Sequence, residues 1–437
     1  MRTDRPAHRF FAASIVALAL SAGSVKAQNP IVVDQKFFGG AGNESGTGVA
    51  VVNTGAGFSI YASGNSTALD GEGILVKYQL PTGSYTSSQS WSTTFPGAAG
   101  PDAFNGVTAT TTNAYVAGYS FSHTIDTVGD REQKGITLNY AAGGGPAAWE
   151  RQTPAAPGAY AYGGFEGLNG IATTIQSAQQ VLYAVGTGQS GGANGGRLFI
   201  SKLDASGNVV WTRNHDNGGL APGSGGLAVA ANGTNAFLAG YNGDSGTVRA
   251  HLRSYDASGG LAWAQDSAAA GDFRGVTIDN ANSFLYAVGR ATSAAGDFLI
   301  EKRTLAGGLV WSRTFDRFGA DDLLSSVAIV DGRLFGVGAT RGGTAGGSDG
   351  VVLEFNPFNG DLLGSTLWGG AFDDSFSGVA AGEHALHIVG TTSSFGTGGS
   401  DMAFVTFLTS VPEPSTFATA GLALLGAFGW RRRLMRV

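Results

Sequence analysis

One short apolar pattern recurs seven times along the chain, and each copy ends in glycine. Its clearest copies read Leu182-Tyr183-Ala184-Val185-Gly186 and Leu285-Tyr286-Ala287-Val288-Gly289. The seven copies occupy residues 58–64, 114–118, 182–186, 236–240, 285–289, 334–338 and 386–390. The closing glycines lie 49 to 68 residues apart, and a recurrence of this length is typical of folds that place one small sheet in each repeat.

Further strand-like segments flank every copy. Small and β-branched residues precede it, as in Gly48-Val49-Ala50-Val51 and, in the fourth unit, Gly226-Leu227-Ala228-Val229. A run that alternates apolar and polar residues follows, as in Leu198 to Asp204, and marks a half-buried strand. A tryptophan segment completes six units, at Trp91, Trp149, Trp211, Trp263, Trp311 and Trp368. Four strands in each unit, the first with small residues that suit a crowded axis, predict an all-β, seven-bladed β-propeller.

The two ends of the repeat region complement each other. After Leu408 the last unit lacks a tryptophan strand, whereas an unassigned strand, Ile31 to Phe38, precedes the first unit. The segment 38–44 also parallels the segment 368–374, which follows the tryptophan strand of the sixth unit. We therefore predict that the N-terminal strand pairs into the last blade and closes the ring, which removes two open sheet edges.

The repeats resemble the bacterial β-propeller repeat family of the SBBP type over roughly residues 35 to 408, in the order strand, Gly-Val-Ala-Val, Tyr-Val-x-Gly, alternating strand and Trp. The resemblance implies a propeller fold and says little about function, because propellers include enzymes, sugar binders and scaffolds. Two inserts depart from the pattern, Thr153 to Gly167 and His123 to Gln133. Long loops of this kind are where we expect a binding surface.

The N-terminal segment has the order of a secretory signal peptide. Arg2, Arg5 and Arg9 precede an apolar run from Phe10 to Leu20, and small residues follow. We expect signal peptidase to cleave between Ala27 and Gln28, which makes residues 1–27 a signal peptide. A buried N-terminal helix is the alternative.

The C-terminal segment has three ordered parts: Pro412-Glu413-Pro414, an apolar stretch from Phe417 to Trp430, and Arg431, Arg432 and Arg433. As a helix the stretch would be roughly 21 Å long, short of the ~30 Å hydrocarbon core. We predict a short transmembrane helix with the arginines in the cytoplasm, because positive flanks stay on that side of the inner membrane.

This tail resembles the PEP-CTERM sorting signal, also known as the ice-binding-protein C-terminal domain. The resemblance implies that an exosortase recognises Pro412, Glu413 and Pro414 and releases or transfers the protein to the cell surface or extracellular matrix. The alternative is a plain C-terminal anchor. The expected domains are the signal peptide at 1–27, the propeller at 28–410 and the sorting tail at 411–437.

Charge and cysteine content narrow the classes of partner. Without the two terminal segments, the body carries 18 basic and 30 acidic residues, a formal net charge of −12. An acidic body disfavours nucleic acid and anionic lipid headgroups. The chain has no cysteine, so the exported fold does not rely on disulfides.

Candidate chemistry is sparse, and no catalytic or cofactor-binding residues are predicted. His384 and His387 should lie on opposite faces of a strand, and His123, His215 and His251 belong to different units. Recurring acids, at Asp321, Asp322, Asp373, Asp374, Glu44 and Asp102, offer oxygen ligands for weak calcium sites. Capping of turns by their side chains explains the same positions, and we favour it.

Three functions are compatible with this sequence. The leading hypothesis is a non-enzymatic surface or matrix scaffold that binds exopolysaccharide or a surface protein. The first alternative is a secreted propeller enzyme with its site at the central channel. Ice binding is the least favoured, because no repeated Thr-x-Thr ladder accompanies the tail.

Overall fold

The computed structural model describes residues 29–40, 42–67, 71–95, 101–121, 133–153, 166–189, 196–215, 223–243, 246–292, 296–343 and 346–409. Within these ranges it contains 27 β-strands and no helix, so no described helix is long and apolar enough to cross a membrane. The predicted signal peptide with Ala27 and Gln28, and the predicted tail with Pro412, Glu413, Pro414 and Arg431 to Arg433, lie outside the described residues.

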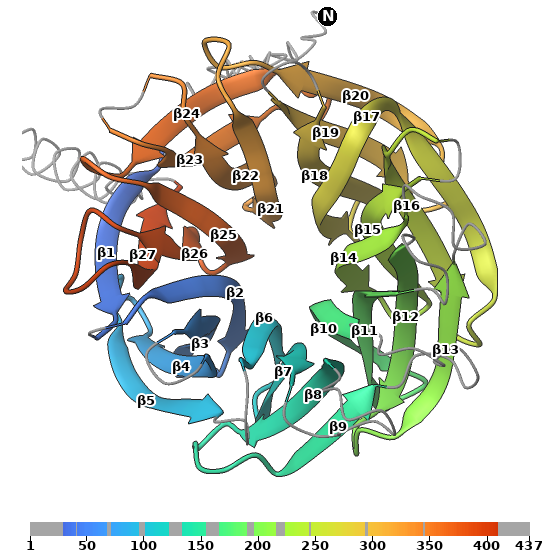
Figure 1. The fold of residues 1–437 in the computed structure, drawn as a ribbon, viewed down its shortest axis with the longest axis horizontal. Coiled ribbons are helices and arrows are strands. Elements are labelled where there is room, and N and C mark those ends of the chain that lie inside the picture. Colours follow the sequence, from blue (N-terminus) through green and yellow to red (C-terminus); the bar gives the residue numbers. More distant parts are fainter. Residues whose placement is uncertain are drawn as a thin grey trace, which may run out of the picture.

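The strands form sheets that stand around a central axis, as a propeller does (Figure 1). We number the repeat units 1 to 7 in chain order. The innermost strands are β2 (Glu44–Asn53), β6 (Ala103–Ala109), β10 (Glu166–Gln176), β14 (Gly225–Ala231), the second half of β17 (Leu261–Asp279), β21 (Asp322–Val330) and β25 (Asp374–Ala381). Next come β3 (Gly57–Ser66), β7 (Asn113–Ser120), β11 (Gln179–Gln189), β15 (Asn235–Asn242), β18 (Phe284–Ala291), β22 (Arg333–Thr340) and β26 (Ala385–Thr392).

The outer half of each unit follows the same order. The third strands are β4 (Glu72–Pro81), β8 (Lys134–Ala141), β12 (Gly196–Asp204), β16 (Arg249–Asp256), β19 (Asp297–Thr304), β23 (Asp349–Phe355) and β27 (Asp401–Leu408). The outermost are β5 (Ser88–Phe95), β9 (Trp149–Thr153), β13 (Val209–His215), the first half of β17, β20 (Leu309–Phe315), β24 (Leu362–Trp368) and β1 (Ile31–Phe38). The six tryptophans lie on outermost strands, as the repeat predicted.

The fourth and fifth units share one strand, which the sequence did not predict. Strand β17 runs for 19 residues; its first part pairs with β16 and its second part, from Gly271, pairs with β18. The described strands therefore form five four-stranded sheets and one seven-stranded sheet. The backbone stays extended from Trp263 to Gly275, so one strand serves both units.

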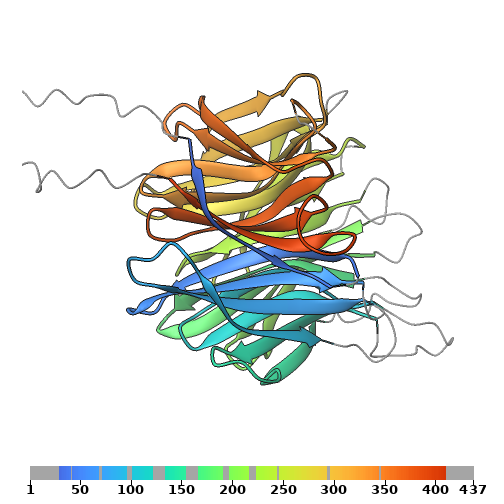
Figure 2. The same ribbon diagram turned by 90° about the vertical axis from the view of Figure 1, so that its left-hand side faces the viewer.

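The N-terminal strand pairs with the last strand of the repeat region, as predicted. Strand β1 lies antiparallel to β27, from Ile31 opposite Leu408 to Phe38 opposite Met402 (Figure 2). Its Asp34 carboxylate also accepts hydrogen bonds from the Ser87 backbone N–H (2.8 Å) and hydroxyl (2.6 Å) in unit 1. Strand β1 thus holds the last unit against the first.

Strand directions define two faces of the molecule. The backbone N–H of Glu44, at the start of β2, donates to Ser400 beside the start of β27, at 2.8 Å. We call this side, where the innermost strands begin, the entry face. Ile31 and Leu408 lie at the opposite ends of their strands, on what we call the terminal face.

A ring of small residues explains how closely the innermost strands approach. The positions are Gly48, Gly106, Gly170, Ala228, Gly275, Ser326 and Gly378. A Cβ on Gly48 would lie 3.2 Å from the Gly106 Cα, and one on Gly378 would lie 3.1 Å from the Gly48 Cα. The small residues expected near the axis are therefore required by backbone contact. The sequence alignment of unit 4 was wrong by two residues, since Ala228 and not Gly226 pairs at this position.

Candidate functional site

Every innermost strand carries one extra residue at the same height. The register shifts at Gly46/Gly48, Phe104/Gly106, Leu168/Gly170, Gly226/Ala228, Phe273/Gly275, Leu324/Ser326 and Phe376/Gly378. The residues at these bulges are Thr47, Asn105, Asn169, Leu227, Arg274, Ser325 and Ser377. Because a β-bulge re-aims a side chain, we call these seven residues the bulge ring.

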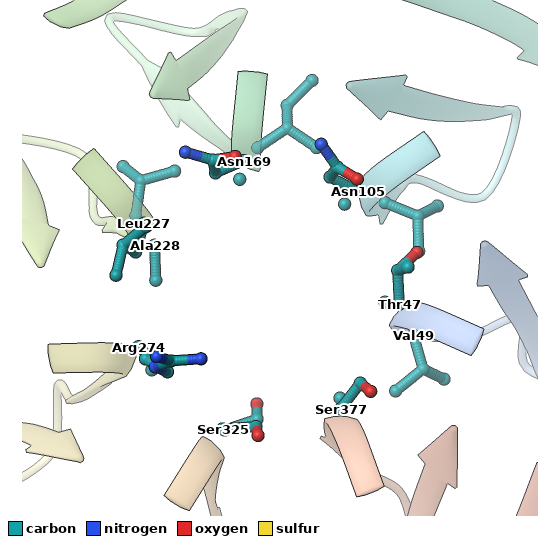
Figure 3. Close-up of a pocket in the computed structure, with 18 of the residues that line it drawn as sticks. Thr47, Val49, Asn105, Asn169, Leu227, Ala228, Arg274, Ser325 and Ser377 are labelled. Atoms are coloured by element: carbon teal, nitrogen blue, oxygen red, sulfur yellow. The ribbon is translucent and has the colours of Figure 1, made fainter. Parts of the chain in front are cut away.

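The bulge ring surrounds the central channel. Together with neighbouring glycines and aliphatic residues, its members line a cavity of about 190 Å³. Figure 3 shows their side chains arranged around the open axis, contributed by all of the innermost strands. The repeated bulge therefore gives each unit one side chain with which to line the channel.

Units 1 to 3 use these side chains to hold the next unit. The Thr47 hydroxyl donates to the Phe104 carbonyl at 2.5 Å, and the Asn105 amide donates to the Leu168 carbonyl at 2.9 Å. The Asn169 amide donates to the Gly226 carbonyl at 2.8 Å. In each case the acceptor directly precedes the bulge of the following unit, so these donors stabilise the ring of strands.

Units 4 to 7 use the same position differently. Leu227 is apolar, and Arg274 forms a 2.7 Å ion pair with Asp272 on its own strand. Among the described residues, no group hydrogen-bonds the hydroxyls of Ser325 or Ser377. This arc of the ring offers a guanidinium and two hydroxyls, which can bind a ligand in the channel.

A second pocket adjoins the channel on the entry side. It measures about 300 Å³ and lies between units 2 and 3. Its lining residues are Asn105, Tyr119, Gln133, Gly167, Asn169, Thr187, Gly188 and Gly196. Asn105 and Asn169 line both hollows, so the two adjoin at these side chains. Gln133 and Gly167 are the C-terminal limits of the two inserts that the sequence marked as a binding surface; most of both inserts lies outside the described residues.

The recurring acids cap turns at the entry face. Glu44, Asp322 and Asp374 are buried at equivalent positions at the starts of β2, β21 and β25. Each accepts a backbone N–H, from Gly40 (3.1 Å), Arg317 (2.6 Å) and Gly370 (2.8 Å). Each also accepts a hydroxyl from the adjacent strand, from Ser66, Thr340 and Thr392. These contacts are the capping that the sequence favoured over calcium binding.

Their neighbours in sequence are more exposed. Asp321 forms a 2.7 Å ion pair with Arg290. Asp373 accepts the Ser348 backbone N–H at 2.8 Å, and this bond lowers the pKa of the carboxyl. Burial raises the pKa of Asp322 despite its hydrogen bonds from Thr340 and Arg317. Within the described ranges, no three His, Cys, Asp or Glu side chains are placed to hold a metal ion.

His384 and His387 do not lie on opposite faces of one strand as the sequence predicted, because His384 precedes β26; two other histidines, from different units, meet. His384 lies in a turn at φ 55° and pairs with Asp331 at 2.7 Å, whereas His387 is buried in the core. His251 pairs with Asp266 at 2.6 Å and stacks on His215 from the neighbouring unit, with ring centroids 6.3 Å apart. No pattern in the sequence indicates this contact, because only the packing of units 3 and 4 creates it. His123 lies outside the described residues.

Comparisons with known proteins identify the tail and report neighbours of the fold. Residues 410–433 match the PEP-CTERM protein-sorting motif. No curated protein sequence matches the chain. Among solved structures, the chain is similar to Sqt1 from Chaetomium thermophilum at 12% identity and a TM-score of 0.45, covering 84% of this chain and 97% of that one. It is also similar to the Dos1 propeller (10%, TM-score 0.44, 87% and 95% covered) and to polysaccharide lyase Uly1 (11%, TM-score 0.47, 83% and 90% covered).

Proposed function

We propose that this chain is an exosortase-sorted surface protein. Its seven-bladed β-propeller binds a ligand at the central channel and does not catalyse a reaction of that ligand. The PEP-CTERM motif at 410–433 indicates export to the cell surface. Exosortase processing near Pro412 to Pro414, a transient membrane-spanning helix and a cleaved signal at Ala27 are the finer parts of the proposal.

The blade count rests on strand pairing. If β17 is counted once with β14 to β16 and once with β18 to β20, the described strands make seven groups of four. The last group includes β1. Seven sequence repeats, together with the pairing of β1 with β27 in the last group, support a ring that the N-terminal strand closes.

The observation that carries the binding function is the bulge ring. The β-bulge that recurs in every unit places seven side chains, of five residue types, around one cavity. Among the described residues that line the cavity, Arg274 is the ionisable one. Hydroxyls, amides and a paired guanidinium bind and orient ligands, whereas general acid–base catalysis relies on groups that exchange protons near neutral pH. The set therefore favours recognition over turnover.

The position of the ring suits display from a tethered chain. The bulges lie three or four residues from the start of β2 and β25, near the entry face. The sorting motif follows Leu408 in the sequence, and Leu408 lies on the terminal face. A protein held by its tail would therefore direct the ring away from the membrane.

The test measures binding and turnover on the same intact exported protein. Glycan-array and pull-down experiments on the wild-type chain should capture a ligand, and the double variant R274A/S325V should lose it. Phe358→Ala, at an exposed residue on the β23–β24 hairpin of the terminal face, is the matched control. Absence of any ligand would refute the proposal, and release of a cleaved product would favour the channel enzyme instead.

Processing is tested separately by intact-mass analysis. The cell-associated and secreted forms are purified and weighed. A secreted form that ends near Pro412 to Pro414 supports exosortase cleavage, whereas a full-length tail in both forms supports a plain anchor.

A further inference from the structure

We infer that the pocket between units 2 and 3 binds one neutral sugar residue of a glycan chain that continues into the channel. This inference rests on the proposed binding function and names its ligand class and its second site. Asn105 and Asn169 line both the pocket and the channel, so the two hollows adjoin at these side chains, and a glycan that contacts them from the pocket lies at the edge of the channel.

The pocket is shaped by glycines around one aromatic ring. A Cβ on Gly167 would lie 3.2 Å from the Gln133 Nε2 and 3.8 Å from the Tyr119 Cδ1. The missing side chain therefore leaves space beside the tyrosine ring. The Tyr119 ring is itself held edge-on by Phe121, with centroids 5.9 Å apart and planes at 88°. A fixed aromatic surface beside an open space suits the apolar face of a sugar ring.

The amides at the junction are oriented before any ligand arrives. Asn105 uses its Nδ2 to bond the Leu168 carbonyl, and Asn169 uses its Nδ2 to bond the Gly226 carbonyl and, at 3.3 Å, the Thr187 hydroxyl. The Oδ1 atoms are then the groups left to accept hydrogen bonds. Two fixed acceptors match a pair of sugar hydroxyls, and amides that are already ordered lose little entropy on binding.

The charge around the pocket selects a neutral ligand. Among the described residues that line the pocket, none is a Lys, Arg, Asp or Glu. Burial raises the pKa of Tyr119, and the nearby Asp102 carboxylate raises it further, so the phenol stays protonated and donates. In the channel, Arg274 is already paired with Asp272. A uronic acid carries a negative charge that none of the described lining residues balances, and the net charge of −12 on the body repels it, whereas a neutral hexose meets no such penalty.

The experiment compares two glycans and three variants by calorimetry on the intact exported protein. The probes are neutral oligosaccharides (hexose tetramers) and uronic-acid tetramers of equal length. We expect the neutral tetramer to bind, and the uronic-acid tetramer to bind at least tenfold more weakly. Tyr119→Ala should weaken binding of the neutral tetramer at least tenfold. Gly167→Ala should weaken it severalfold, since the added methyl enters the pocket and displaces only the flexible end of Gln133. Phe358→Ala should have no effect.

The outcomes separate this inference from the proposed function. Tighter binding of uronic acid, or unchanged affinity in both Tyr119→Ala and Gly167→Ala, would overturn the neutral-sugar pocket while leaving channel binding in place. Capture of a protein partner with no glycan affinity would also overturn it. A thermal melt of each variant within a few degrees of the wild type ensures that a lost affinity is not lost folding.

Discussion

Two rings of residues, one position apart on the innermost strands, behave in opposite ways. The ring that includes Gly48, Gly275 and Gly378 holds only glycine, alanine or serine in all seven units, because the backbones of successive strands touch there. The bulge ring immediately before it holds a threonine, two asparagines, a leucine, an arginine and two serines. Residue type is restricted at the position where neighbouring backbones touch, and it varies at the position where the side chain faces the channel.

The bulge ring itself divides in the same way. Thr47, Asn105 and Asn169 bond the following unit, so they serve the fold as well as the cavity. Arg274, Ser325 and Ser377 make no such bond to a neighbouring unit within the part of the chain that the structure describes. Variation within a repeat therefore locates the side chains that are free to contact a ligand. Substitutions at Gly275, Ser325 and Thr47 test that division, and substitutions at His387 and Asp34 test a core position and the junction between the last and first units.

The largest expected effect comes from a larger side chain in the ring of small residues. In Gly275→Val, the new Cβ would lie 2.7 Å from the Ser326 Cα, and backbone on that side cannot move aside. We expect a loss on the order of 3–5 kcal/mol in the free energy of unfolding. Urea denaturation measures it, with Arg274→Ala beside it as the control. Equal effects of the two changes would contradict the division between the rings.

A core position that departs from the repeat gives the next effect. His387 stands where the other units place Tyr61, Tyr115, Tyr183, Phe237, Tyr286 and Phe335. Burial lowers the pKa of His387 to about 4, against about 6.5 in an unfolded chain. The unfolded chain therefore binds a proton first, so stability falls as the pH drops from about 6.5 to 4, by up to about 3 kcal/mol.

His387→Phe restores the residue type of the other units and removes this titration. The unfolding free energy of the variant should depend less on pH between 4 and 6.5 than that of the wild type. Exposed His384, mutated to Asn, is the control. An unchanged pH slope in His387→Phe would assign the acid sensitivity to other groups.

Opening the junction between the last and first units should cost less. Asp34→Ala removes the acceptor of both Ser87 hydrogen bonds and the partner of Lys36. We expect about 2 kcal/mol of destabilisation, because a buried donor loses a charged partner. Thermal unfolding measures it, and hydrogen exchange in β1 should rise most. Faster exchange spread evenly over all units would argue against a local junction.

The smallest stability effect is expected in the free arc. Ser325→Ala removes a hydroxyl that no described residue bonds, so the unfolding free energy should change by less than about 0.5 kcal/mol. Thr47→Val, which removes the bond to the Phe104 carbonyl, should cost about 1 kcal/mol. The pair is compared by urea denaturation. A larger loss in Ser325→Ala than in Thr47→Val would reverse our assignment of the two arcs.

Much of the fold could be read from local patterns. The glycine near the end of each second strand and the tryptophans of six outermost strands lie where they were predicted. The third strands also lie where they were predicted, but the expectation that they are half-buried was wrong. The interior of β12 is buried throughout, because the neighbouring units pack on both of its faces. In unit 4 the local pattern misplaced the small residue near the axis. Its Gly225 and Gly226 both resemble the glycine that touches the next strand, yet the extra residue Leu227 shifts that role to Ala228.

The candidate site was largely invisible in the sequence. The predicted strands of this layer began at Gly275, Ser326 and Gly378, so the bulge residues Arg274, Ser325 and Ser377 lay just before them and were not recognised as lining positions. Asn105 and Asn169 belong to different units, and only the packing of β6 beside β10 brings them into one pocket. The sequence pointed instead to the inserts, whose limits Gln133 and Gly167 border that pocket.

Local patterns and counts along the chain are enough to predict the number and order of the repeats, the pairing of the first strand with the last, and the sorting motif. The tertiary structure alone decided which side chains meet: the seven bulge residues around the channel, the acids in their caps, and His251 against His215. Contacts between units depend on the register and approach of whole sheets, and no single stretch of the chain encodes either.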